Sequence, residues 1–122
     1  MTTTKKLPHD HGTHSEEILN SFPDDNVIHA VADALKQLGD PSRLRIFWLL
    51  CHAEECVANI AAAVDMTSPA VSHHLKQLKS ANLITSKRSG KEMNYRAADT
   101  PLVKYLHLTM EEVGEITCPG NK

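Results

Sequence analysis

The sequence has few aromatic residues, no long apolar run and an odd number of cysteines. Aromatic side chains make up 4% of the 122 residues, so the core has to be built mainly from Leu, Ile, Val and Ala. No apolar stretch is long enough to span a bilayer, and the polar N-terminus does not resemble a secretory signal. Three cysteines argue against a disulfide framework and favour thiols in a reducing compartment. These absences predict one globular domain in the cytoplasm, with no membrane partner.

Acidic residues are also absent from residues 68–91, although the chain as a whole has a formal net charge of −2. The positive residues of this block are Lys76, Lys79, Lys87, Arg88 and Lys91. The rest of the chain therefore carries −7. A positive surface confined to one block of an acidic protein predicts contact with DNA. The alternative is a solvated amphipathic helix with a basic face.

Capping residues and helical periodicity predict three helices in the first half of the chain. Residues 1–14 form a polar arm with three histidines. Ser15 is expected to cap a short helix, and Asp24 or Asp25 to cap a second one. Asp40, followed directly by proline, predicts the start of a third helix.

The second half of the chain predicts a helix-turn-helix followed by a β-hairpin. Residues 56–64 are expected to form a short apolar helix, and Thr67 or Ser68 to cap the next helix after a tight connection. Residues 83–88 and 93–97 have the pattern of two strands joined by a turn. The predicted fold is mainly α-helical with a small hairpin wing, a winged helix-turn-helix. Its divisions are an arm at 1–14, a DNA-binding and dimerisation domain at 15–118 and a tail at 119–122.

The second helix of a helix-turn-helix places its N-terminal residues in the major groove of DNA. Ser72 and His73 can form hydrogen bonds with base edges there, and the cations of the block suit phosphate contacts. Val71, Leu75 and Leu78 fall on the opposite face and are expected to pack inward. The predicted DNA-contacting residues are Ser68, Pro69, Ala70, Ser72, His73, Lys76, Lys79, Lys87, Arg88 and Lys91.

One such element contacts too little DNA for useful specificity, which predicts a homodimer on paired half-sites. A last helix, beginning between residues 99 and 101, is the candidate dimer surface. Its apolar residues are Leu102, Leu106, Met110 and Val113. The same pattern equally favours a helix that covers the core of the monomer.

Several segments together resemble the ArsR/SmtB family of bacterial metal-responsive repressors. Residues 38–46, LGDPSRLRI, resemble the family's LADPxRLRIL segment, and residues 55–60, ECVANI, resemble its ELCVCDL box. Residues 68–78, SPAVSHHLKQL, resemble its recognition helix, SxxxVSHHLKxL. The resemblance also includes the wing and extends over about residues 27–113. It implies a winged-helix homodimer that represses its operator without inducer and releases it when the inducer binds.

The resemblance implies a sensor site built on the cysteine box and the arm of the partner chain. This sequence keeps Cys56 of the box and has Ala58 at its second cysteine position. The predicted metal ligands are Cys56, His9, His11 and His14. Such a set suits Zn(II) best, and also Cd(II), Ni(II), Co(II) or Cu. Alternatively, Cys56 is a small core residue and the arm is a tail.

A second family site lies on the last helix, across the dimer interface. Asp99, Glu112 and Glu115 occupy its positions here, and a proline stands where the family has a histidine. Carboxylates alone form a harder site, which suits Mn(II) or weakly bound Zn(II). His107, one turn before Glu111, can add a ligand. The alternative is a solvated acidic face.

A third possibility is a repressor of the same fold that senses persulfide or oxidants through thiols. Cys51 or Cys56 would then react with Cys118, although nearby acidic residues favour the unreactive protonated thiols. An enzyme is not expected, because the sequence has no Gly-rich phosphate loop and no catalytic base arrangement. The histidines of the arm also suit a metal-storage protein, but such a protein would not need the basic helix and wing.

Overall fold

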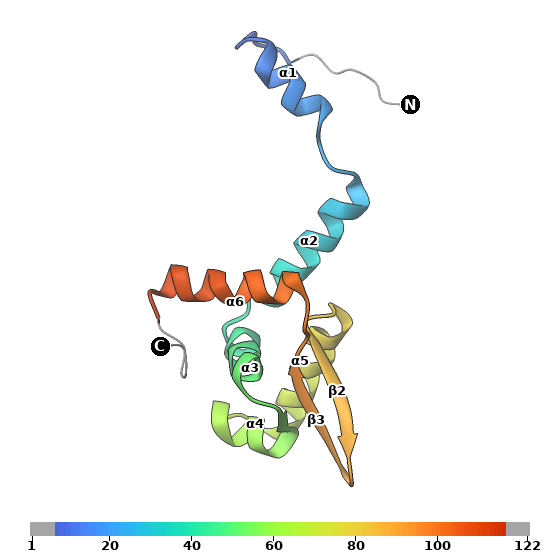
Figure 1. The fold of residues 1–122 in the computed structure, drawn as a ribbon, viewed down its shortest axis with the longest axis vertical. Helices are drawn as coiled ribbons and strands as arrows, with labels where there is room; N and C mark the ends of the chain where they lie inside the picture. The colour runs from blue at the N-terminus through green and yellow to red at the C-terminus, as the bar shows by residue number, and fades with distance from the viewer. Residues whose placement is uncertain (1–6, 117–122) are drawn as a thin grey trace. The chain divides into compact units, whose positions relative to one another are not determined.

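The structure is a computed structural model that describes residues 7–116, apart from the side chain of Thr13. The chain divides into two units, one ending at Ala32 and one beginning at Asp33. The elements are α1 (Thr13–Asn20), α2 (Asp25–Gln37), α3 (Pro41–His52), β1 (Glu55–Cys56), α4 (Val57–Val64), α5 (Ser68–Ser80), β2 (Ile84–Ser89), β3 (Glu92–Ala97) and α6 (Pro101–Gly114) (Figure 1). No helix in the described residues is long and apolar enough to cross a membrane. Cys118 and the predicted tail at 119–122 lie outside the described residues.

Side-chain caps begin α3, α5 and α6. The Asp40 carboxylate accepts a hydrogen bond from the backbone N–H of Arg43 at 3.0 Å, and proline follows Asp40, as the sequence predicted. This hydrogen bond is the main reason that the pKa of Asp40 lies below its usual value. Thr67 and Thr100 cap α5 and α6 in the same way.

The prediction that Ser15 caps the first helix is wrong. α1 begins at Thr13, and the residue before it is Gly12, which has a φ of 104°. The Gly12 N–H donates to the Asp10 carboxylate at 2.9 Å, which closes a local turn just before the helix. Since only glycine adopts this backbone conformation easily, the chain enters the helix earlier than the serine cap indicated.

The prediction that the helix of the cysteine box begins at Cys56 is also wrong. Cys56 lies in the two-residue strand β1, and α4 begins at Val57. Cys56 pairs with Asn94 and Glu55 pairs with Tyr95 of β3, so β1 extends the sheet in the order β1-β3-β2. The local sequence does not indicate this strand, because its partner lies much later in the chain.

The predicted hairpin is confirmed. β2 and β3 pair antiparallel from Ile84 with Ala97 to Ser89 with Glu92. Two residues join them, and the first, Gly90, has a φ of 65° that suits glycine in a tight hairpin turn.

The core of the second unit is formed mainly by α3, α4, α5 and the base of the hairpin. Phe47 has no exposed surface and is the largest fully buried side chain. The other fully buried large residues are Ile46, Ile60, Val71, Leu75, Leu78, Leu83 and Ile84. The core is therefore aliphatic around a single phenylalanine, as the scarcity of aromatic residues predicted.

Replacing Phe47 with alanine should lower the free energy of unfolding by about 3–5 kcal/mol, because a large buried side chain leaves a cavity. The chain's other phenylalanine, Phe22, is 68% exposed and provides a matched control. The Phe22→Ala change should cost less than about 0.5 kcal/mol. Urea unfolding of both variants at equal protein concentration, followed by circular dichroism, measures the difference. Equal destabilisation would contradict the described core.

Candidate DNA-binding surface and sensor residues

α4 and α5 form a helix-turn-helix. The turn between them includes Asp65, whose φ of 57° lies in the left-handed region. The N–H of Met66 donates to the carbonyl of Ala61 at 3.0 Å, which closes the end of α4 before Thr67 starts α5. The hairpin β2–β3 follows α5 in the chain (Figure 1). The predicted order of helix, turn, helix and wing is confirmed.

The two faces of α5 have different chemistry. Val71, Leu75 and Leu78 are buried, as predicted. The residues predicted to contact DNA on the other face are Ser68, Pro69, Ser72, His73, Lys76 and Lys79, all exposed, with Ala70 half-buried. The helix therefore presents small and hydrogen-bonding side chains near its N-terminus and lysines farther along.

The two adjacent histidines of α5 have different environments. His73 is exposed, whereas His74 is half-buried and its Nδ1 has no hydrogen-bond partner among the described residues. Burial lowers the pKa of His74 below its usual value, against the opposing effect of the Asp40 carboxylate. Burial thus favours the neutral form of His74, which packs against its neighbours. The exposed side chain of His73 is free to contact a molecule that binds along α5.

The wing presents exposed cations at and beside its turn. Lys87 and Arg88 lie on β2, and Lys91 lies in the turn itself. Arg96 on β3 is a further exposed cation, in register with Thr85 at the end of the hairpin away from its turn. Arg96 lies beyond Glu92 and so outside the acid-free block, and only the alternation of residues along the second strand indicates its exposure.

Lys79 has a structural contact as well as an exposed position. Its ammonium donates a hydrogen bond to the hydroxyl of Ser86, which connects α5 to β2. An ammonium has three N–H donors, so this contact leaves donors for a phosphate.

Cys56 is held between the helix-turn-helix and the wing. Its thiol is free and half-buried, and its backbone pairs with Asn94 of β3. It also immediately precedes α4 and lines a cavity of about 200 Å³ together with Glu92 and Met93. A ligand at Cys56 would therefore bind beside α4, the first helix of the helix-turn-helix, and beside β3 of the wing.

The arm histidines belong to the first unit, whereas Cys56 belongs to the second. His9, His11 and His14 are exposed, and the rings of His9 and His11 lie 6.3 Å apart. Within the described part of a single chain, no group of three or more His, Cys, Asp or Glu side chains is arranged to hold a metal ion. The predicted site combines ligands from two chains and stays a prediction.

The carboxylates of the second predicted site are far apart within one chain. Asp99 precedes α6 and pairs with Lys104 at 3.5 Å, whereas Glu112 and Glu115 lie at the other end of the helix. The helix rises by about 16 Å between its first residue, Pro101, and Glu112. These side chains can share a metal ion only if two chains contribute.

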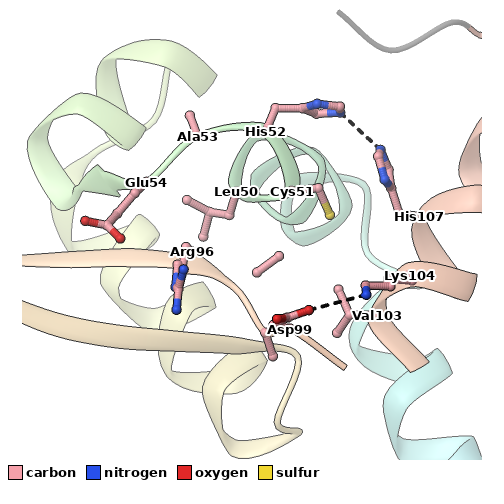
Figure 2. A pocket seen from close by; sticks show the side chains of 12 residues that line it. Leu50, Cys51, His52, Ala53, Glu54, Arg96, Asp99, Val103, Lys104 and His107 are labelled. Atoms are coloured by element: carbon pink, nitrogen blue, oxygen red, sulfur yellow. Dashed lines mark hydrogen bonds and ion pairs between the residues drawn. The ribbon is translucent and has the colours of Figure 1, made fainter. Parts of the chain in front are cut away.

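Cys51 is half-buried in α3 and lines a pocket of about 390 Å³ (Figure 2). Its predicted thiol partner, Cys118, lies outside the described residues. The thiol-sensing alternative therefore stays a prediction.

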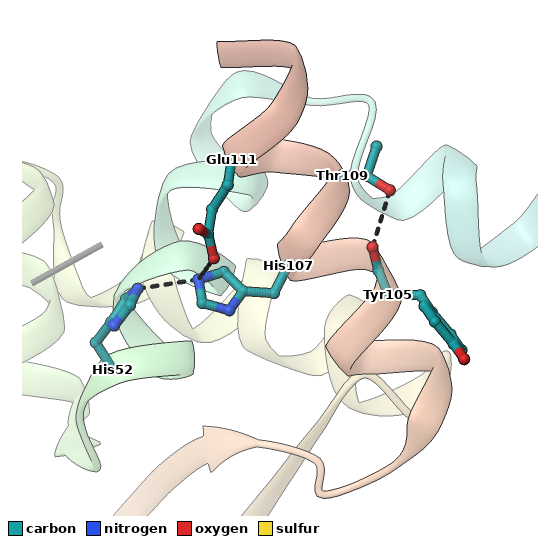
Figure 3. Close-up of polar contacts among 5 residues, drawn as sticks. All are labelled: His52, Tyr105, His107, Thr109 and Glu111. Carbon is teal, nitrogen blue, oxygen red and sulfur yellow. Dashed lines mark hydrogen bonds and ion pairs between the residues drawn. The ribbon is translucent and has the colours of Figure 1, made fainter. Parts of the chain in front are cut away.

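The same pocket includes a histidine pair that the sequence analysis did not anticipate. The Nε2 atoms of His52 on α3 and His107 on α6 are 3.0 Å apart, and Glu111 lies 3.7 Å from His107 (Figure 3). The ring of His52 also lies 4.5 Å from that of Trp48. Burial is the main reason that the pKa of His52 lies below its usual value, followed by the effect of His107 and against that of Glu111. The two histidines are 55 residues apart in sequence, so no local pattern indicates their contact.

α6 has one face in the core and another in solvent. Val103 is buried, and Leu106 and Met110 pack against the core. Four apolar residues of α6 are exposed: Leu102, Tyr105, Leu108 and Val113. Ile116, just after the C-cap of the helix, is exposed as well. Leu35, Leu38, Leu44, Leu106, Met110 and Val113 are among the residues that line an apolar groove of about 370 Å³. Covering the core and offering a dimer surface are therefore compatible roles for this helix.

Known bacterial regulators resemble this chain in sequence. Residues 40–86 match the family model described as bacterial regulatory protein, arsR family. The HTH-type transcriptional repressor SmtB of Mycobacterium tuberculosis is 35% identical over 91 residues, which cover 75% of this chain and 65% of that repressor. The cadmium resistance transcriptional regulatory protein CadC of Listeria innocua is 32% identical over 80 residues, covering 65% of this chain and 67% of CadC. The chain thus spans slightly less than two thirds of SmtB.

A solved structure resembles this chain in both fold and sequence. It is the homodimeric winged helix-turn-helix DNA-binding domain Mb0332 of Mycobacterium bovis, described as a possible ArsR-family transcriptional regulator. The TM-score is 0.68 at 31% identity, over 76% of this chain and 88% of that domain. The predicted winged helix-turn-helix fold is confirmed, and the matched relatives are regulators, in keeping with the expectation that the protein is not an enzyme. This agreement in sequence and in fold shows that the chain belongs to the arsR family of bacterial regulatory proteins.

Proposed function

We propose that the protein is a homodimeric transcriptional repressor that binds double-stranded operator DNA in the cytoplasm. The observation that carries this proposal is the division of α5 into two faces. Its apolar side chains are buried, while Ser72, His73 and the lysines are exposed within a stretch that contains no acid. A face that only needed solvation would have no reason to exclude carboxylates.

The N-terminal half of α5 is suited to the major groove. Ser68, Pro69 and Ala70 are small enough to allow close approach, and Ser72 and His73 can exchange hydrogen bonds with base edges.

The cations of the wing and of α5 are suited to the phosphate backbone. The proposed phosphate contacts are Lys76, Lys79, Lys87, Arg88 and Lys91. Such contacts fix the register of the protein on the duplex and make its affinity depend on salt.

The exposed apolar face of α6 supports the homodimer. Tyr105 is 69% exposed and Val113 is 81% exposed, although both are large and apolar. Apolar side chains gathered on one helix favour an interface with another chain. A second copy also supplies the second recognition helix that a paired operator requires.

We further propose that a transition metal ion, with Zn(II) favoured, is the inducer. The ligands would be Cys56 of one chain and His9, His11 and His14 of the other. Thiolate and imidazole donors match the preferences of Zn(II), and the half-buried free thiol of Cys56 has space beside it. The cadmium-resistance role in the name of the relative CadC supports a metal of this class. A carboxylate site with Asp99, Glu112 and Glu115 of two chains is the second choice.

The position of Cys56 gives a physical route from the inducer site to DNA. Its backbone is bonded to β3 of the wing, and α4 starts at the next residue. A shift of Cys56 therefore moves the middle of β3 and the first helix of the helix-turn-helix together. A metal ion held by Cys56 and the arm histidines would supply the free energy that favours one dimer geometry over another. Reversing a 99:1 preference requires about 5.5 kcal/mol of differential affinity, and by linkage DNA weakens metal binding equally.

The Ser72→Ala, His73→Ala double change should abolish recognition of promoter DNA from beside the protein's own gene. Loss of two base contacts worth about 1–3 kcal/mol each should weaken binding roughly thirtyfold or more. Uptake of zinc should be unchanged. A gel shift compares this variant with a Ser80→Ala, His29→Ala control, whose exposed residues lie outside the predicted recognition surface. Unchanged operator affinity in the first variant would mean that α5 does not read the bases.

Removing a wing cation should weaken binding to all DNA sequences alike. Arg88→Ala and Lys91→Ala should each reduce the slope of log affinity against log salt concentration by about 1, because each removes one phosphate contact. Lys36→Ala, which removes an exposed lysine at the end of α2, should leave the slope unchanged. Fluorescence anisotropy across a salt series measures the slopes. Equal slopes in all four proteins would exclude the wing from the DNA contact.

Cys56→Ser should abolish metal-driven release of the operator while leaving the affinity of the metal-free protein unchanged. The serine hydroxyl is a much weaker zinc ligand than a thiolate. Cys51→Ser is the matched control and should respond as the wild type does. Operator binding is measured with Zn(II), Cd(II), Ni(II) and Cu(I). Unchanged release of Cys56→Ser by every metal would remove this residue from the site, and release by persulfide instead would favour the thiol alternative.

A further inference from the structure

We infer that His52 and His107, with Glu111, form a second metal site for a borderline divalent ion such as Zn(II). It joins the end of α3 to the middle of α6 within a single chain. His52 and Glu111 belong to neither proposed inducer site, and His107 belongs to the carboxylate site only as an added ligand. Metal binding at this position does not depend on the protein acting on DNA.

The spacing of the donor atoms is that of a metal site. The two Nε2 atoms are 3.0 Å apart, and the Glu111 carboxylate oxygen is 3.7 Å from the Nε2 of His107 (Figure 3). Two nitrogen ligands at 2.0–2.1 Å from a tetrahedral zinc ion would be about 3.3 Å apart. The observed distances lie on either side of this value. An ion would replace the hydrogen bond between the two rings, which would turn so that both Nε2 lone pairs face the ion.

The carboxylate requires the larger adjustment. His107 and Glu111 lie four residues apart on α6, and their side chains approach within 3.7 Å on the same side of the helix. As they stand, no three His, Cys, Asp or Glu side chains in the described residues are arranged to hold a metal ion. The two imidazole rings therefore already lie next to each other. Rotation of the Glu111 side chain would add a carboxylate as the third ligand, and water would be the fourth.

The surroundings favour the metal-binding state of His52. Burial lowers the pKa of His52 and so favours the neutral ring, which is the form of imidazole that binds metals. The side chains of His107 and Glu111 are 22% and 18% exposed, so they are ordered by packing and still reachable. The pocket of about 390 Å³ that His52 and His107 line gives an ion a route to both rings (Figure 2).

A metal ion here would hold α3 against α6. His52 is the last residue of α3, and β1 begins three residues later at Glu55. The ion would therefore fix the segment that leads to Cys56 and the wing relative to the proposed dimer helix. This effect on Cys56 and the wing rests on the proposed repressor function, whereas binding of the ion itself does not.

The chain's single tryptophan reports on this site. Trp48 lies one turn before His52, and the two ring centroids are 4.5 Å apart. Binding of Zn(II) to His52 should change the emission of Trp48. The Cys56→Ser protein provides the background, because it lacks the thiol of the proposed inducer site.

The test titrates zinc chloride into the full chain without DNA and follows Trp48 emission and binding heat. In the Cys56→Ser background, His107→Gln and Glu111→Gln should each lower the zinc affinity of the site that Trp48 reports by about tenfold or more. His29→Gln, which changes an exposed histidine of α2, should bind as the background protein does. His107→Gln keeps a hydrogen-bonding group of similar size and leaves Trp48 and His52 in place, and circular dichroism checks that each variant is folded.

If zinc changes Trp48 emission equally in the His107→Gln, Glu111→Gln and His29→Gln proteins, the inference is wrong. The contact between His52 and His107 is then only a hydrogen bond between two imidazoles. The inference is equally wrong if zinc leaves Trp48 emission unchanged in the Cys56→Ser protein. Neither result bears on operator binding, so the proposed repressor function stands or falls separately.

Discussion

The packing of α5 into the core is the constraint on which the rest of the structure depends. Val71, Leu75 and Leu78 are buried together with Ile46 and Phe47 of α3. Since a helix repeats every 3.6 residues, burying this stripe determines which side chains face outward. The serine, histidine and lysine residues of the other face are therefore presented together, in a fixed orientation. The side chains of the proposed DNA surface are thus oriented by the burial of the opposite face of the helix.

The short strand β1 connects the parts that regulation would have to link. It contributes only Glu55 and Cys56 to the sheet, but it pairs with β3 and leads directly into α4. A backbone pairing transmits displacement better than a flexible loop, because its hydrogen bonds fix both segments together. The cysteine box thus has a mechanical connection to the wing as well as a proposed ligand role.

α6 covers the core with one face and leaves apolar side chains exposed on another. Its inner residues Val103, Leu106 and Met110 pack on the core, while Tyr105 and Leu108 remain exposed. His107 lies between these surfaces and meets His52 at the end of α3. Any group that binds this histidine pair would act on the contact between the body of the winged helix and the proposed dimer helix.

The sequence by itself determined the helix-turn-helix, the hairpin and the inner and outer faces of α5, because these depend on short-range periodicity and on caps such as Asp40 and Thr67. It also located the cations, since charge is read directly from composition. It misplaced the start of α1, where a glycine turn preceded the expected serine cap, and it placed Cys56 in a helix. Only the tertiary structure decided that Cys56 belongs to a strand and that His52 lies beside His107. Both contacts join residues about 40 or more positions apart in the chain, and such contacts arise from the packing of whole elements, which local sequence patterns do not encode.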